Sequence, residues 1–144
     1  MALDFIADCG ADPTGASDVA PALAWYQANG RGHKLRVPAG RYKLVASGAP
    51  AIALEEMEIE GEMRSWRRGA GADDFAACFE IYGAATDASP FELRKNAAVR
   101  GISFVYPQQT DPAAPIAYSA TLRLAADPAG IDITRNLFVN SYVA

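Results

Sequence analysis

Residues 64–71 form a basic, glycine-rich segment whose side chains could bind an acidic sugar. The segment reads RSWRRGAG and places Arg64, Arg67 and Arg68 next to Trp66. Guanidinium groups bind carboxylates through paired hydrogen bonds, and an aromatic ring can stack on a sugar. These residue types favour binding of an anionic polysaccharide, but they also fit a solvated insertion or a loop that docks a protein partner. The GKS or GKT ending of a nucleotide phosphate loop is missing.

A second group of candidate chemical residues is a run of glutamates between positions 55 and 62. Glycosidases hold two carboxyl groups across a sugar bond, so this run could be a catalytic cluster. However, Met57 and Ile59 alternate with the acidic residues, which is typical of a strand with one face in solvent. We favour the solvent face and assign no catalytic residue. The glutamates are Glu55, Glu56, Glu58, Glu60 and Glu62.

The proline-rich connection from Tyr106 to Tyr118 is a third candidate. A connection of this length without secondary structure is often functional or bound to a partner. Its flanking tyrosines, with Gln108 and Gln109, suit sugar hydroxyls, while the simpler interpretation is a rigid loop packed along the wall of the fold.

The remaining candidate residues favour structural roles. His33 is the single histidine, and no serine or cysteine stands in a nucleophile motif, so no catalytic triad is predicted. Cys9 and Cys78 provide neither a metal site nor a disulfide framework, and we expect buried, reduced thiols. Four aspartates lack the spacing of a calcium loop and fit caps and turns better: Asp4, Asp8, Asp12 and Asp18. We therefore predict no metal and no cofactor.

The best-defined element that could position these groups is a short helix, predicted over residues 18–29. Val19, Leu23 and Tyr26 recur with helical spacing and form its apolar face. A helix of this length is marginal alone and must dock this face on other elements.

The ends of this helix follow from its proline, aspartate and glycine residues. Pro21 is harmless only within the first helical positions, which makes Asp18 the better N-cap than Ser17. The carboxylate of Asp18 also suits the positive end of the helix. Gly30 supplies the stop and is expected in the left-handed conformation.

The rest of the chain is predicted to form short strands, three of which return to the same face. Ile59, Val99 and Ile133 start similar segments, and the last two segments each place a phenylalanine five residues later. Asn136 and Asn140 are expected at the corners, bonded to neighbouring backbone. The predicted strands cover residues 35–37, 42–45, 51–54, 56–62, 78–82, 99–106, 121–124 and 131–139.

Two stretches near the N-terminus, IADCGADPTGASDVAPAL and LRVPAGRYKL, resemble a known family. They are similar to the N-terminal segment of pectate-lyase-like right-handed parallel β-helices, with its patterns FGA-D-x-x-G-x-S-D and V-x-(V/I)-P-x-G-x-Y. Cys9 departs from this pattern, because an aromatic residue is usual there. The resemblance covers residues 4–62. The matching residues are Gly10, Ala11, Asp12, Gly15, Asp18, Pro38, Gly40 and Tyr42.

The resemblance implies a mostly β fold, a right-handed parallel β-helix of few coils capped at its N-terminal end by the helix. The family includes polysaccharide lyases and hydrolases and the spike proteins of phages, so it implies fold more strongly than activity. We expect one domain over residues 1–144. Residues 1–30 would form the first strand, turn and cap, and residues 31–144 the coils, with loops inserted at about 64–75 and 106–119.

Composition agrees with one folded domain. The chain has 144 residues, of which 51% are hydrophobic, and a net charge of −4, which argues against disorder and broad nucleic-acid binding. No apolar run is long enough to cross a bilayer. Asp4 and Asp8 interrupt what would be the core of a signal peptide. We expect synthesis in the cytoplasm, with association with a virion still open.

A β-helix with one capping helix leaves its far end open, with unpaired backbone and apolar side chains. We therefore expect a homo-oligomer, a trimer being one option, or docking to another virion or β-helix chain. The favoured hypothesis is a non-enzymatic spike or tail component of a phage-like particle, acting as adaptor or polysaccharide-binding subunit. The alternative is the N-terminal part of a polysaccharide lyase or glycoside hydrolase whose catalytic coils are missing.

Overall fold

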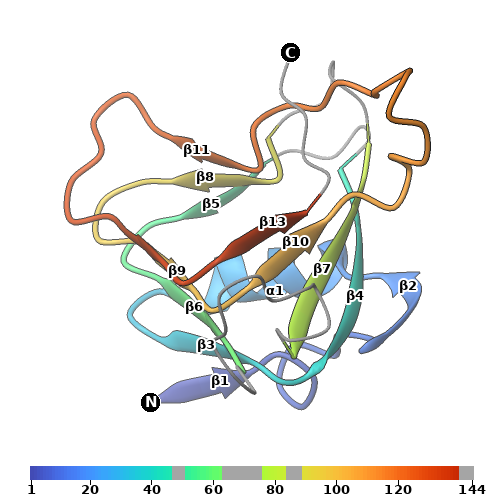
Figure 1. Ribbon diagram of the computed structural model, residues 1–144. Coiled ribbons are helices and arrows are strands. Elements are labelled where there is room, and N and C mark those ends of the chain that lie inside the picture. Colours follow the sequence, from blue (N-terminus) through green and yellow to red (C-terminus); the bar gives the residue numbers. More distant parts are fainter. Residues whose placement is uncertain (47–50, 63–75, 84–88, 140–144) are drawn as a thin grey trace.

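The computed structural model describes residues 1–46, 51–62, 76–83 and 89–139, which form three parallel sheets and the helix α1 (Ala20–Asn29) (Figure 1). The first sheet contains β1 (Ala2–Asp4), β3 (Lys34–Val37), β6 (Glu58–Gly61), β9 (Ala98–Arg100) and β12 (Asp132–Thr134). The second contains β2 (Thr14–Asp18), β4 (Gly40–Val45), β7 (Ala77–Tyr82), β10 (Ser103–Val105) and β13 (Leu137–Val139). The third contains β5 (Ile52–Leu54), β8 (Phe91–Leu93) and β11 (Leu122–Leu124).

The chain visits these sheets in a repeating order. From β3 onward it passes through the first, second and third sheet in turn, and each return adds a strand beside the previous one. Every strand pair is parallel; Figure 1 shows β13, β10 and β7 side by side in the second sheet. The prediction of a mostly β fold built from parallel strands is confirmed.

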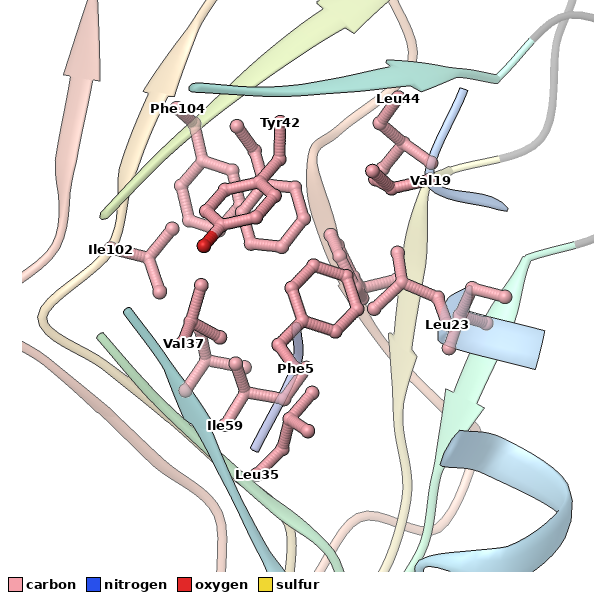
Figure 2. Packing of buried hydrophobic residues seen from close by; sticks show 14 of the residues in the cluster. Phe5, Val19, Leu23, Leu35, Val37, Tyr42, Leu44, Ile59, Ile102 and Phe104 are labelled. Carbon is pink, nitrogen blue, oxygen red and sulfur yellow. The ribbon is translucent and has the colours of Figure 1, made fainter. Parts of the chain in front are cut away.

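Strand register aligns apolar side chains in layers within the core. Leu35, Ile59 and Val99 occupy one register position of the first sheet, and all three are buried. In the second sheet, Tyr42 is in register with Phe79, and their ring centroids lie 5.6 Å apart. Figure 2 shows side chains from several strands converging on this core. The predicted return of Ile59, Val99 and Ile133 to one face is confirmed by their register.

Two predicted strands are each divided between two sheets. The segment 99–106 bends after β9 at Gly101, whose φ is +65°, and continues as β10 in the second sheet. The segment 131–139 bends at Arg135, whose φ is +55°, between β12 and β13. At this bend the Asn136 side chain accepts a hydrogen bond from Ile102 N and donates one to Val99 O. The predicted corner role of Asn136 is confirmed, whereas Asn140 lies outside the described residues.

Helix α1 begins later than predicted. Its N-cap is Val19, and Asp18 is instead the last residue of β2, where backbone pairing with β4 keeps it extended. The Asp18 carboxylate accepts hydrogen bonds from the amides of Ala20 and Val45, both at 3.0 Å. The prediction of Asp18 as N-cap is therefore wrong by one residue, although its carboxylate does bond the first helical amide and joins it to the second sheet.

The end of α1 also differs from the prediction. Gly30 has a φ of −97°, so it is not left-handed; the left-handed glycine of this loop is Gly32, at +77°. Gly30 is required for a different reason: an added Cβ would overlap the ring of Tyr26. Close packing rather than backbone conformation therefore selects glycine at position 30.

The apolar face of α1 docks as predicted and covers one edge of the third sheet. Val19, Leu23 and Tyr26 are buried, and the Tyr26 hydroxyl lies 2.7 Å and 2.9 Å from the backbone oxygens of His33 and Glu58. The helix contacts β5, the edge strand of the third sheet. Gln27 Oε1 accepts a hydrogen bond from an amide of this strand, Ala53 N, at 2.9 Å.

A left-handed residue recurs at one corner of the fold. Gly32, Glu56, Asn96 and Gly130 have φ between +52° and +77° and each stands two residues before a strand of the first sheet. Their backbones are linked across successive turns: Gly32 N bonds to Glu56 O at 2.8 Å, and Glu56 N bonds to the carbonyl of Lys95 at 2.8 Å. The corner therefore repeats with each return of the chain, like the strands.

Candidate functional site

The last strands of the three sheets, β11, β12 and β13, expose large apolar side chains at one end of the fold. Leu124 on β11 is 50% exposed, and Ile133 on β12 and Phe138 on β13 are each 42% exposed. Each strand pairs on one side only among the described residues. These three side chains and the outer edges of their strands are called the end face below.

The apolar side chains of the end face occupy core positions. Ile133 is in register with the buried Val99. Phe138 is in register with Phe104, and the two rings stack with centroids 5.2 Å apart and an interplanar angle of 17°. On the third sheet, Leu124 is in register with the buried Leu93. The end face is therefore an outer layer of the hydrophobic core, on which no further strand of the described residues is paired.

Charged groups of both signs surround the end face. Arg100 binds the Asp132 carboxylate through two nitrogens, at 2.6 and 2.9 Å, and these bonds lower the pKa of Asp132. Asp127, on the turn between β11 and β12, lies 3.6 Å from Lys95. On β11, Arg123 is 64% exposed. A partner would meet an apolar centre with acidic and basic groups at its rim.

Three outward-facing glutamates, Glu56, Glu58 and Glu60, take part in ion pairs. Lys34 Nζ lies 3.2 Å from Glu58 and 2.5 Å from Glu60, and Arg100 also pairs with Glu58. The hydrogen bond from Lys34 lowers the pKa of Glu60, and the one from Arg31 lowers that of Glu56. These carboxylates are partners in ion pairs along the solvent face, and the lowered pKa of Glu56 and of Glu60 is opposite to the raised pKa of a glycosidase acid.

A hollow of about 430 Å³ lies at the corner between the third and first sheets. Its charged groups already have partners: Lys34 with Glu58, and Glu56 with Arg31. It offers no unpaired charged group around which to build a binding site. The lining residues are Gly32, His33, Lys34, Glu56, Met57, Glu58 and Asn96.

The predicted glycan-binding residues are only partly within the described chain. Arg64, Trp66, Arg67 and Arg68 lie outside the described residues, so their role stays a prediction. Tyr106 and Tyr118 are 1% and 4% exposed, and their ring centroids lie 4.6 Å apart.

The two tyrosines belong to the core in this structure, and neither presents a ring face to a ligand. The Tyr106 hydroxyl bonds to Thr121, and burial raises the pKa of Tyr106 and of Tyr118. The loop between them is fixed by its glutamines. The Gln109 side chain makes two hydrogen bonds with the backbone of Ile116, at 2.6 and 2.8 Å. These contacts favour a loop of defined conformation, although residues 110–116 are exposed rather than packed on the fold.

The aspartates near the N-terminus hold turns, as predicted. Asp12 accepts bonds from Thr14 and from Ser17 N, which lower its pKa to about 2. Asp4 Oδ1 accepts from the amides of residues 6 and 7.

The cysteines are not in a disulfide. Cys78 is buried, and burial raises the pKa of Cys9 to about 11, which keeps that thiol protonated. Within the described ranges, no three His, Cys, Asp or Glu side chains are grouped to hold a metal.

Comparisons with protein-family models, with curated proteins and with solved structures found no match to this chain. Over the described part of the chain, no helix has both the length and the apolar character needed to cross a membrane. The structure identifies which residues form the end face, and the sequence alone did not assign them to it. Its signal was the shared five-residue spacing of Val99 with Phe104 and of Ile133 with Phe138, which marks them as successive core layers.

Proposed function

We propose that the chain is a right-handed parallel β-helix and serves as a non-enzymatic, oligomeric adaptor in the spike or tail of a phage-like particle. Three observations support the β-helix: the repeating visits to three parallel sheets, the left-handed residue at each turn of one corner, and the helix that covers the edge of β5. The residues at positions 10–18 and 38–42 that resemble pectate-lyase-like proteins point to the same fold.

The observation that carries the adaptor role is the end face. Leu124, Ile133 and Phe138 are core positions with 42–50% of their surface in solvent, one on the last strand of each sheet. Edge strands with apolar side chains and unpaired backbone groups are sites where another chain adds its strands. Strand pairing through such a face would join two chains rigidly, which is what an adaptor requires.

The ion pairs of the outward-facing carboxylates support a non-enzymatic role. Lowered pKa values at Glu56 and Glu60 fit surface ion pairs rather than proton donors. The alternative is the N-terminal part of a polysaccharide lyase or glycoside hydrolase. Release of oligosaccharides from an acidic polysaccharide by the purified chain would favour that alternative. We also propose that the basic segment 64–68 binds such a polysaccharide.

Sedimentation velocity over a wide range of protein concentration tests the adaptor role. We expect a species heavier than the 15.3 kDa chain, and Ile133→Thr should shift it toward the monomer because the change puts a hydroxyl into the apolar centre. Ile116→Thr is the matched control: Ile116 is 38% exposed but lies in the loop between β10 and β11 and on none of the three strands of the end face. A chain that stays monomeric at every concentration contradicts the adaptor role.

A further inference from the structure

We propose that the occupant of the end face is the same face of a second copy, so that two chains stack through a two-fold axis with their last strands antiparallel. This inference rests on the proposed assembly through the end face and names its partner. Four features support it: the obstruction of the opposite end, the direction of the edge backbone groups, the fit of the three sheets, and the charges at the rim.

The opposite end of the molecule cannot receive the end face of a copy. There the edge of the third sheet is covered by α1, and Gln27 Oε1 occupies the amide of Ala53 on β5. A head-to-tail stack would need β11 of one copy to pair with β5 of the next, and α1 stands in that place. The surface of a second copy that can offer three strand edges to the end face is therefore its own end face.

The backbone of β12 directs its free groups outward at Ile133. Asp132 N donates to Ala97 O, and Thr134 O accepts from Gly101 N, so both neighbours of Ile133 bond toward β9. Because backbone groups alternate in direction along a strand, the N–H and C=O of Ile133 point to the open side. Two copies of Ile133 can therefore exchange both hydrogen bonds across a two-fold axis, with Cα atoms about 5.5 Å apart.

The same axis matches the other two sheets. A two-fold axis through β12, perpendicular to the stacking direction, places β13 of one copy on β11 of the other, also antiparallel. It keeps inward side chains inward, so Phe138 meets the leucines of β11 in a shared core. The three end strands have equal length, three residues each, which lets all three edges pair together. Such an isologous contact closes on itself and pairs the outer edges of β11, β12 and β13.

Charges at the rim fit this antiparallel register. With Ile133 opposite its own copy, Asp132 lies across from the partner's Thr134 and one step from the partner's Arg135. Asp132 and the partner's Arg135 therefore approach each other across the axis, which is favourable, while Asp132 keeps its bonds to Arg100 of its own chain.

Oxidation of an Ile133→Cys variant tests the two-fold contact. Two cysteines at this position would have Cα atoms at about 5.5 Å, within the range of about 4.4 to 6.8 Å that a disulfide accepts. We expect a covalent dimer of twice the 15.3 kDa chain mass under oxidising conditions. Arg123→Cys is the matched control: it is exposed on β11, which faces β13 rather than itself, so it should form far less covalent dimer. The unchanged chain measures the background from Cys9 and Cys78.

The outcomes separate this inference from the proposed function. A reversible dimer that Ile133→Thr dissociates, with selective cross-linking at position 133, supports both. An assembly larger than two that Ile133→Thr dissociates, with no cross-link at position 133, overturns the two-fold contact but leaves assembly through the end face standing. A chain that is monomeric at every concentration overturns both. Near-ultraviolet and far-ultraviolet circular dichroism establish that each variant is folded before it is scored.

Discussion

At the scale of single residues, the left-handed corner shows what the sequence does and does not reveal. Gly32 and Gly130 are of the residue type that favours positive φ, but Glu56 and Asn96 take the same conformation at equivalent places. A non-glycine residue in this conformation costs roughly 1–2 kcal/mol. The corner was therefore not predicted from sequence, because a glutamate within an alternating acidic run carries no signal of a turn.

Two substitutions at this corner should change the free energy of unfolding in opposite directions. Gly130→Ala should lower the free energy of unfolding by roughly 1–2 kcal/mol, because an added Cβ would also lie 2.5 Å from Asn96 Oδ1. Glu56→Gly should be neutral or stabilising, since it relieves the positive φ and gives up only an exposed ion pair with Arg31. Urea denaturation of both variants measures the difference. Equal losses in the two variants would show that the corner is not built on this conformation.

The Asp12 turn should give acid sensitivity. Its carboxylate has a usual pKa of 3.8, lowered to about 2 by bonds from Thr14 and Ser17. A lowered pKa in the folded state means that the stabilisation is complete above the unfolded-state pKa and is lost as pH falls from about 4 toward 2. Asp12→Ala should therefore lower the urea midpoint at pH 6 but much less at pH 2. An equal loss at both pH values would show that the ionised carboxylate does not hold this turn.

At the scale of elements, apolar alternation predicted most strands and the docked face of the helix. It missed β2, because Thr14–Asp18 has no apolar alternation and is extended through pairing with β4. It also missed β8 (Phe91–Leu93), although Phe91 and Leu93 flank a polar residue just as the leucines of the predicted β11 do. The segments 99–106 and 131–139 were each predicted as one strand, but each belongs to two sheets. Gly101 signals the first bend because glycine favours positive φ, whereas Arg135 gives no such signal for the second.

The docking of α1 can be tested on its two faces. Leu23→Ala should lower the free energy of unfolding by about 2–5 kcal/mol, because Leu23 is fully buried against the sheets. Trp25→Ala removes more atoms from the same helix but should cost less, since Trp25 is 41% exposed. Chemical denaturation of both variants gives the comparison. A larger loss for Trp25→Ala than for Leu23→Ala would mean that the helix does not cap the core through the Leu23 face.

At the scale of the whole molecule, the sequence predicted an open end but not the residues that form it. That expectation came from finding one capping helix and a strand-like final segment. The structure shows where the opening lies and that it carries Leu124, Ile133 and Phe138. The residues that face inward on a last strand depend on its register with a strand 31 to 34 positions earlier. That register is set by loops whose length the sequence pattern does not fix.

Hydrogen exchange at the end face tests whether a second chain pairs with β11, β12 and β13. The amides of Leu124, Ile133 and Phe138 point to the open side if backbone directions alternate along their strands. Their exchange should be fast in dilute solution and slow at high concentration, when a second chain pairs with them, whereas the amide of Leu35 in the sheet interior should stay protected throughout. Fast exchange at these three amides at every concentration would contradict assembly through the end face.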